Sequence, residues 1–300
     1  MPLRPLVPVS RRQFLLRGAA ATGAVLLGAC GDEESGGGDG TPPTSTPGGL
    51  ALVQFFGGLP MLVASAEVRA PFGVADAEGL LPVDRTPKTL TVSVLGPDGS
   101  TVVEPLEVVR HAQGLPRGYF PLRFTVEEPG VYTGRTDVDG EAVEMAIKVD
   151  AAADVTAIQR GAAMPVLATP TPDDARGVDP ICTNDPVCPL HDVTVGDALM
   201  EDRPIALLVA TPAFCQIAIC GPVLDVLLNV TNDHPEVRFL HAEVYAHPHQ
   251  NLDAKAAVVD ELGLTFEPCL VLVGSDGQVV ERLDTIYDDV ELDEALARLA

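Results

Sequence analysis

Two cysteines, Cys215 and Cys220, lie where a hydrophobic segment at 204–210 gives way to a segment with the pattern of a helix. Further along the chain, Cys269 opens another hydrophobic segment. A cysteine just ahead of a helix faces unpaired backbone N–H groups and the positive end of the helix dipole, and both favour the thiolate over the thiol. Because the thiolate is the reactive form of cysteine, this arrangement predicts thiol–disulfide chemistry.

The spacing of the two cysteines limits where the helix can begin. On an ideal helix, residues five apart point about 140° apart, and their Cα atoms lie beyond the roughly 7 Å that a disulfide tolerates. We therefore expect Cys215 in the turn before the helix and Cys220 in or near its first turn. We predict that Cys215 is the attacking thiol and Cys220 the resolving thiol. A permanent structural disulfide between them is the alternative.

The order of the expected elements from about 181 to the end resembles the thioredoxin superfamily. Segment 211–225 is similar to the active-site turn and first helix of that family, and segment 266–277 is similar to its strand that begins with a cis-proline. The resemblance implies that Pro268 is the cis-proline that shapes a substrate groove, and that Glu267 offers its backbone to a bound peptide. The spacing of four residues between Cys215 and Cys220 departs from the usual spacing of two in this family.

Other roles for this segment stay open. The cysteine spacing also resembles some peroxiredoxins, but Pro212 stands where those peroxidases need threonine or serine. A redox-inactive, partner-binding thioredoxin-like domain with a structural disulfide is a second alternative. No acidic residue of the expected core strands is evident as a proton acceptor; Asp225 and Glu267 are the nearby candidates.

A copper-delivery protein is a third alternative, because three histidines follow one another closely at His241, His247 and His249. Copper-delivering members of the superfamily combine a cysteine pair with one distant histidine, a role that His247 or His249 would take here. His241 alternates onto the buried face of the strand expected at 237–245, where a structural histidine is more common.

The N-terminus carries export signals. The sequence Ser-Arg-Arg-Gln-Phe-Leu at 10–15 is a twin-arginine pattern, and the apolar run after it is too short to span a membrane. The run ends in Leu-Gly-Ala-Cys at 27–30, which resembles a bacterial lipobox. We therefore expect a signal peptide at 1–29, lipid on Cys30, a disordered tether at 30–49 and a location on the extracytoplasmic face of the cell membrane.

The charge of the chain restricts its partners. Removal of residues 1–29 takes four arginines and no acidic residue, which changes the formal net charge from −24 to −28. Such a surface repels nucleic acid. We expect an exported protein as substrate or redox partner, contact with the membrane only through the lipid on Cys30, no nucleic acid and no cofactor.

Residues 50–150 have the pattern of an all-β domain. Alternating segments lie at 89–95, 120–126, 131–136 and 142–149, with Asp-Gly turns at 98–99 and 139–140. This pattern, with a proline–glycine turn before Tyr132, resembles an immunoglobulin-like β-sandwich without the usual cysteine pair. The chain is therefore predicted to be multidomain: an immunoglobulin-like sandwich at 50–150, a linker at 151–180 and an α/β thioredoxin-like domain at 181–300.

A second pair of cysteines, Cys182 and Cys188, flanks an Asp-Pro dipeptide shortly before His191. In an exported protein the simplest prediction is a structural disulfide that closes a small loop. An electron-passing second redox pair stays open. Zinc or copper held by Cys182, Cys188 and His191 stays open too, although the spacing is not that of the familiar zinc motifs and no fourth ligand is evident. We therefore assign no metal to the chain at this point.

Overall fold

The computed structural model describes residues 49–56 and 58–299. The described residues belong to one compact unit. The predicted signal peptide, the lipid on Cys30 and all of the predicted tether except residue 49 lie outside the described residues. Among the described helices, none has both the length and the apolar character needed to cross a membrane.

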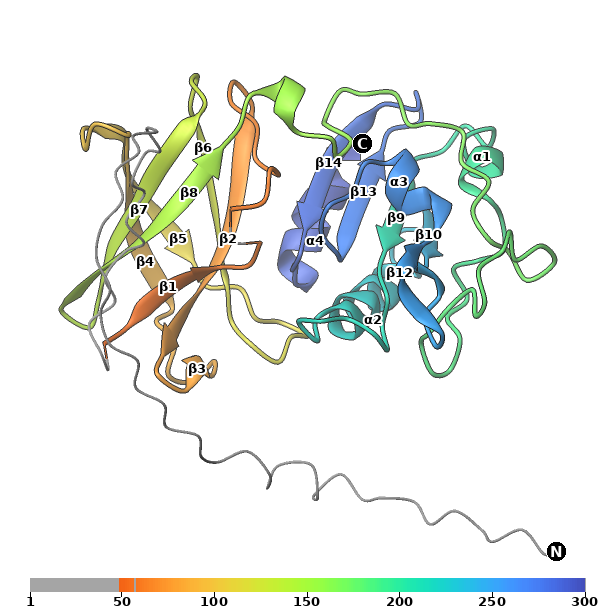
Figure 1. Ribbon diagram of the computed structural model, residues 1–300, viewed down its shortest axis with the longest axis horizontal. Helices are drawn as coiled ribbons and strands as arrows, with labels where there is room; N and C mark the ends of the chain where they lie inside the picture. Colours follow the sequence, from red (N-terminus) through yellow and green to blue (C-terminus); the bar gives the residue numbers. More distant parts are fainter. Residues whose placement is uncertain (1–48, 57, 300) are drawn as a thin grey trace, which may run out of the picture. The chain divides into compact units, whose positions relative to one another are not determined.

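The first half of the described chain is built from two four-stranded antiparallel sheets (Figure 1). One sheet has the order β5-β4-β7-β8, with β4 at Thr89–Leu95, β5 at Thr101–Val109, β7 at Gly130–Val138 and β8 at Glu141–Val149. In the other, β2 (Glu67–Asp76) pairs with β1 (Ala51–Gln54), β3 (Gly79–Leu80) and β6 (Phe120–Thr125). Alternate side chains of β4, β6, β7 and β8 are buried in one core shared by the two sheets.

The four expected segments of this half coincide with β4, β6, β7 and β8. The hydroxyl of Tyr132 donates a 2.6 Å hydrogen bond to the backbone carbonyl of Glu128, so the tyrosine ties its strand to the turn that precedes it. The structure adds β1, β2, β3 and β5, which the sequence pattern did not predict.

The second half contains a four-stranded sheet of order β10-β9-β13-β14. These strands are β9 (Ile205–Val209), β10 (Arg238–Ala242), β13 (Cys269–Val273) and β14 (Val279–Asp284). Strand β10 is parallel to β9, whereas β13 is antiparallel to both β9 and β14. A short hairpin of β11 (Tyr245–His247) and β12 (Asn251–Lys255) follows β10, and 3-10 turns lie at Ala152–Asp154 and Ala297–Leu299.

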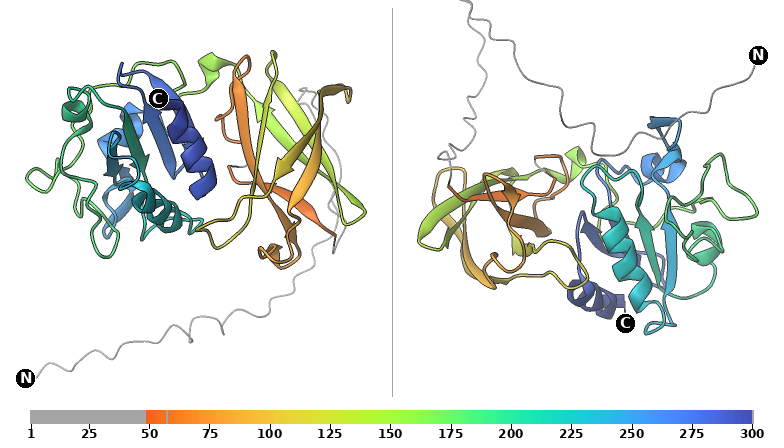
Figure 2. Two further views of the ribbon diagram at one scale, coloured as in Figure 1. Left: turned by 180° about the vertical axis from the view of Figure 1, so that it is seen from behind. Right: turned by 90° about the horizontal axis from the view of Figure 1, so that it is seen from below.

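Helices cover both faces of this sheet (Figure 2). Residues of α2 (Cys220–Val230) and α4 (Asp289–Leu296) share one core, and residues of α1 (Val195–Ala198) and α3 (Ala257–Glu261) share the other. Because both faces are covered, β9 and β13 are buried at every position and read as continuous hydrophobic runs. Side chains of β13 alternate between the cores, so Leu270 faces α2 and α4 whereas Cys269 belongs to the opposite core.

Part of the segment expected to be a linker packs against this sheet. Met164 and Leu167 are buried in the core that holds α1 and α3, and the backbone N–H of Met164 donates to the carbonyl of Gly277 at 2.8 Å. The predicted domain boundaries stay predictions.

A buried ion pair joins β2 to α4. The Nη2 of Arg69 lies 2.7 Å from Oε2 of Glu291, and both side chains are almost fully buried. Arg69 also donates hydrogen bonds to the backbone carbonyls of Asp284 and Ile286.

Candidate active site

The Cys215–Cys220 pair lies at the junction of β9 and α2. Helix α2 begins at Cys220 with Ile219 as its N-cap, and Cys215 lies in the loop before it, as the spacing predicts. The two Sγ atoms are 2.7 Å apart. The backbone N–H of Cys220, one of the unpaired donors of the first helical turn, points to Sγ of Cys215 at 3.3 Å.

The two thiols have opposite acidities. The pKa of Cys215 is lowered to about 6, mainly by the hydrogen bond that the Cys220 thiol donates and further by backbone N–H groups of Cys220, Ile219 and Ile217. The pKa of Cys220 is raised by its burial, and further by the neighbouring Cys215 and Glu267. At neutral pH the half-buried Cys215 is therefore the thiolate and the fully buried Cys220 the thiol.

Glu267 contributes its side chain to the pair. Its Oε2 lies 3.0 Å from Sγ of Cys220, and burial, together with the negative charges of Cys215 and Glu243, raises its pKa to about 7. A carboxylate with this pKa is suited to accept the proton of Cys220 near neutral pH. The sequence predicted a substrate-binding role for the backbone of Glu267 and raised its side chain only as a candidate acceptor. The other candidate, Asp225, is exposed on α2.

Pro268 lies directly after this carboxylate, and the Glu267–Pro268 peptide bond is cis, as the resemblance implies. The carbonyl of Pro268 accepts a 2.8 Å hydrogen bond from the backbone of Thr285. A cleft of about 360 Å³ adjoins the pair. Its lining includes Gln216 and Ile217 of the cysteine loop, Tyr245 of β11, and Glu267.

Neither Cys269 nor the histidines considered for copper join this pair. Cys269 is 1% exposed and packs in the core on the other face of the sheet, which matches the role of a small hydrophobic residue. His249 is exposed and lies edge-on to Phe214, and His247 lies in β11. Within the described residues, the group of potential metal ligands at Cys215 and Cys220 contains Glu267 and no histidine. The geometry thus gives no support to copper held by this pair and a histidine.

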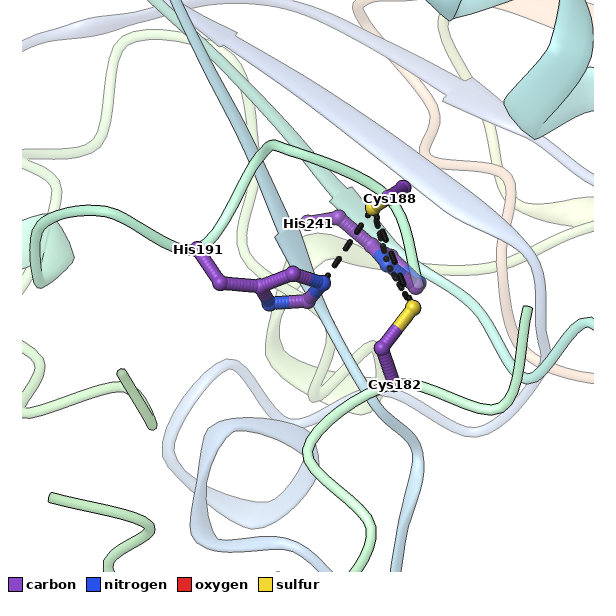
Figure 3. A group of neighbouring side chains, drawn as sticks. All are labelled: Cys182, Cys188, His191 and His241. Atoms are coloured by element: carbon purple, nitrogen blue, oxygen red, sulfur yellow. Dashed lines mark hydrogen bonds between the residues drawn. The ribbon is translucent and has the colours of Figure 1, made fainter. Parts of the chain in front are cut away.

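A second group of side chains forms a buried cluster: Cys182, Cys188, His191 and His241 (Figure 3). The Sγ atoms of Cys182 and Cys188 are 3.8 Å apart, and no disulfide joins them here. The sequence analysis treated the fourth member, His241, as a structural histidine and did not join it to this cluster, because His241 is distant from the cysteines in sequence and lies on β10. The backbone N–H of His241 donates a hydrogen bond to the carbonyl of Leu190, which joins β10 to the loop at 182–191. The Cys182–Cys188 disulfide stays a prediction.

Comparisons with known proteins give little direct guidance. No protein-family model matches the chain, and no curated protein matches it. Among solved structures, one described as "Structure of MTB dsbF in its mixed oxidized and reduced forms" is similar to this chain, with 22% sequence identity and a TM-score of 0.30. The similarity covers 37% of this chain and 89% of that one.

Proposed function

We propose that this protein exchanges thiols and disulfides with another exported protein through Cys215 and Cys220. The observation that carries the proposal is the contact between a thiol of lowered pKa and a buried partner thiol, with the Sγ atoms 2.7 Å apart. This arrangement supplies an attacking thiolate together with a resolving thiol that stays protonated until it is needed.

The reaction takes place in two steps. The Cys215 thiolate attacks one sulfur of a substrate disulfide, so that the substrate S–S bond breaks, a mixed disulfide forms and the second substrate sulfur leaves as a thiolate. Cys220 then transfers its proton to Glu267 and attacks Sγ of Cys215, which releases the first substrate sulfur as a thiolate. The substrate gains two electrons, and the Cys215–Cys220 pair loses them to become a disulfide. The reverse sequence oxidises a substrate dithiol.

The fold assignments belong to the same proposal. The order β9, α2, β10, α3, β13, β14, α4 supports a thioredoxin-like domain at 181–300, with Pro268 and Glu267 beside a cleft suited to a peptide. The two antiparallel sheets and the Tyr132 hydrogen bond support an immunoglobulin-like sandwich at 50–150. The twin-arginine pattern and the lipobox support a lipid on Cys30 that holds the protein on the extracytoplasmic face of the membrane.

Replacement of Glu267 by glutamine tests both the exchange and the proton path. In the full-length chain, we expect the resolving step with glutathione disulfide to be on the order of 100-fold slower at neutral pH, because glutamine accepts no proton from Cys220. The wild-type rate should rise with pH and level off above about 7, where Glu267 has lost its proton, whereas in Glu267→Gln the Cys220 proton passes to solvent and the rate should keep rising without that plateau. Stopped-flow measurements from pH 5 to 9 would show the two profiles.

Asp225→Asn is the matched control, because it removes an exposed carboxylate from the helix that carries Cys220. It should keep the wild-type profile. Equal pH profiles for wild type and Glu267→Gln would reject the proton path alone. An absence of exchange by the wild-type chain would reject the proposed function.

A further inference from the structure

The Cys182, Cys188, His191 and His241 cluster has the geometry of a metal site. Two sulfurs bound to one tetrahedral zinc ion lie about 3.8 Å apart, and a sulfur and a nitrogen about 3.6 Å apart, given the usual Zn–S and Zn–N bond lengths. The Sγ atoms of Cys182 and Cys188 are 3.8 Å apart. Nδ1 of His241 is 3.7 Å from one sulfur and 3.4 Å from the other, and Nε2 of His191 is 3.2 Å from Sγ of Cys188.

The orientation of His241 supports a ligand role. Its Nε2 donates a 3.1 Å hydrogen bond to the backbone carbonyl of Ala210, which leaves the lone pair of Nδ1 directed at the two sulfurs. A hydrogen bond from the outer nitrogen to a backbone carbonyl is the usual way in which a metal-binding histidine is oriented. His191 presents Nε2 to the cluster, as Figure 3 shows, and within the described residues its buried Nδ1 has no hydrogen-bond partner.

The four side chains are also closed off from solvent. Each is at most 5% exposed, and four protein donors fill the coordination of a tetrahedral ion, so no position is left for water or a substrate. Two sulfur and two nitrogen donors in a tetrahedral arrangement favour zinc, and a closed set of four ligands is typical of structural zinc sites. By contrast, a disulfide requires sulfurs about 2.05 Å apart and makes no use of the histidines.

We propose that Cys182, Cys188, His191 and His241 bind one Zn²⁺ ion that fixes the 182–191 loop onto β10. On binding, the ion takes the place of the two thiol protons, which are released, and no electrons are transferred. The loop in turn supports the active-site turn, because Oγ1 of Thr183 accepts a 3.2 Å hydrogen bond from the backbone of Ala213. The zinc ion thus stabilises the loop that carries Cys215 indirectly, through the 182–191 loop, and is not itself part of the Cys215–Cys220 pair.

The test measures zinc in the full-length chain with Cys215→Ser and Cys220→Ser, which removes the other candidate ligand pair. After purification under reducing conditions and dialysis with Zn²⁺, mass spectrometry of the metal should find about one zinc per chain. Cys188→Ser and His241→Ala should each lower the zinc content to near zero. His249→Ala, which removes an exposed histidine outside the cluster, should keep it at about one.

Cobalt provides a second measurement, which does not depend on the folding of a variant with a substitution in the cluster. Co²⁺ added to the apo form of the same chain should give the visible bands of a tetrahedral ion and charge-transfer bands from thiolate, and Zn²⁺ should abolish both. Zinc content unaffected by His241→Ala in a folded variant would overturn the proposal. The proposal would also be overturned if the chain bound no Co²⁺ and peptide mass spectrometry found Cys182 and Cys188 joined as a disulfide despite reduction. Neither result bears on exchange by Cys215 and Cys220.

Discussion

The Cys220→Ser variant should remain covalently joined to its substrate, whereas Cys215→Ser should lose exchange altogether. Cys215 carries the thiolate, with a pKa of about 6, so its removal takes away the nucleophile and should lower the exchange rate on the order of a thousandfold or more. In Cys220→Ser the first attack still occurs, but no thiol lies 2.7 Å away to release the substrate. Non-reducing gels and intact-mass spectrometry would show the adduct.

The control for this pair is Cys269→Ala, which removes a thiol from the opposite face of the sheet and should leave both exchange and adduct formation unchanged. An adduct that forms equally in Cys215→Ser would assign the attack to another cysteine. Equal exchange by all three variants would show that the pair takes no part in the reaction.

The Arg69→Met variant should lose about 3 kcal/mol of unfolding free energy, the lower end of the range for breaking a buried ion pair. The substitution leaves Glu291 buried without its main partner and deprives two backbone carbonyls of their donor. Arg123, whose Nη2 lies 3.0 Å from Oε1 of Glu291, keeps the loss from being larger. Urea unfolding of the full-length chain at neutral pH would measure the change.

The difference in unfolding free energy between wild type and Arg69→Met depends on pH through the pKa of Glu291. In the folded chain this pKa is lowered from 4.5 to about 2, because the attraction of Arg69 and its hydrogen bonds outweigh the effect of burial. The stability it contributes is complete above about pH 4.5 and is lost as pH falls toward 2. The gap between wild type and Arg69→Met should therefore narrow below pH 4.5.

Arg135→Ala, which breaks an exposed pair with Glu144, should cost less than about 1 kcal/mol. Equal losses in both variants would contradict the account.

Strong local patterns allowed much of the fold to be predicted from the sequence. Strands β4, β7 and β8 alternate between buried and exposed side chains, and β9 and β13 are unbroken hydrophobic runs between covered faces. The missed strands lack these patterns. Nearly all of β2 is buried, but its Pro71 and Gly73 are residues typical of loops, so the sequence did not indicate a strand. Most of β5 is exposed, and it has no hydrophobic face that would indicate a strand.

The candidate site was predictable where its parts lie in one segment. Cys215 lies in the loop just before α2 and Cys220 is the first residue of α2, so the spacing of the two cysteines was enough to place them. The contact between Glu267 and Cys220 depends on the pairing of β13 with β9. The position of His241 beside Cys182 depends on the pairing of β10 with β9. Such contacts are set by the tertiary structure, and no local pattern in the sequence encodes them.

The reduction potential of the Cys215–Cys220 pair tests the central claim most directly. It can be measured on the full-length chain in glutathione buffers of graded potential, with Cys215→Ser and Cys220→Ser as controls that cannot form the disulfide. A working exchange protein should show a reversible two-electron couple between roughly −270 and −120 mV. A pair that stays oxidised below about −300 mV would be a structural disulfide and would contradict the account.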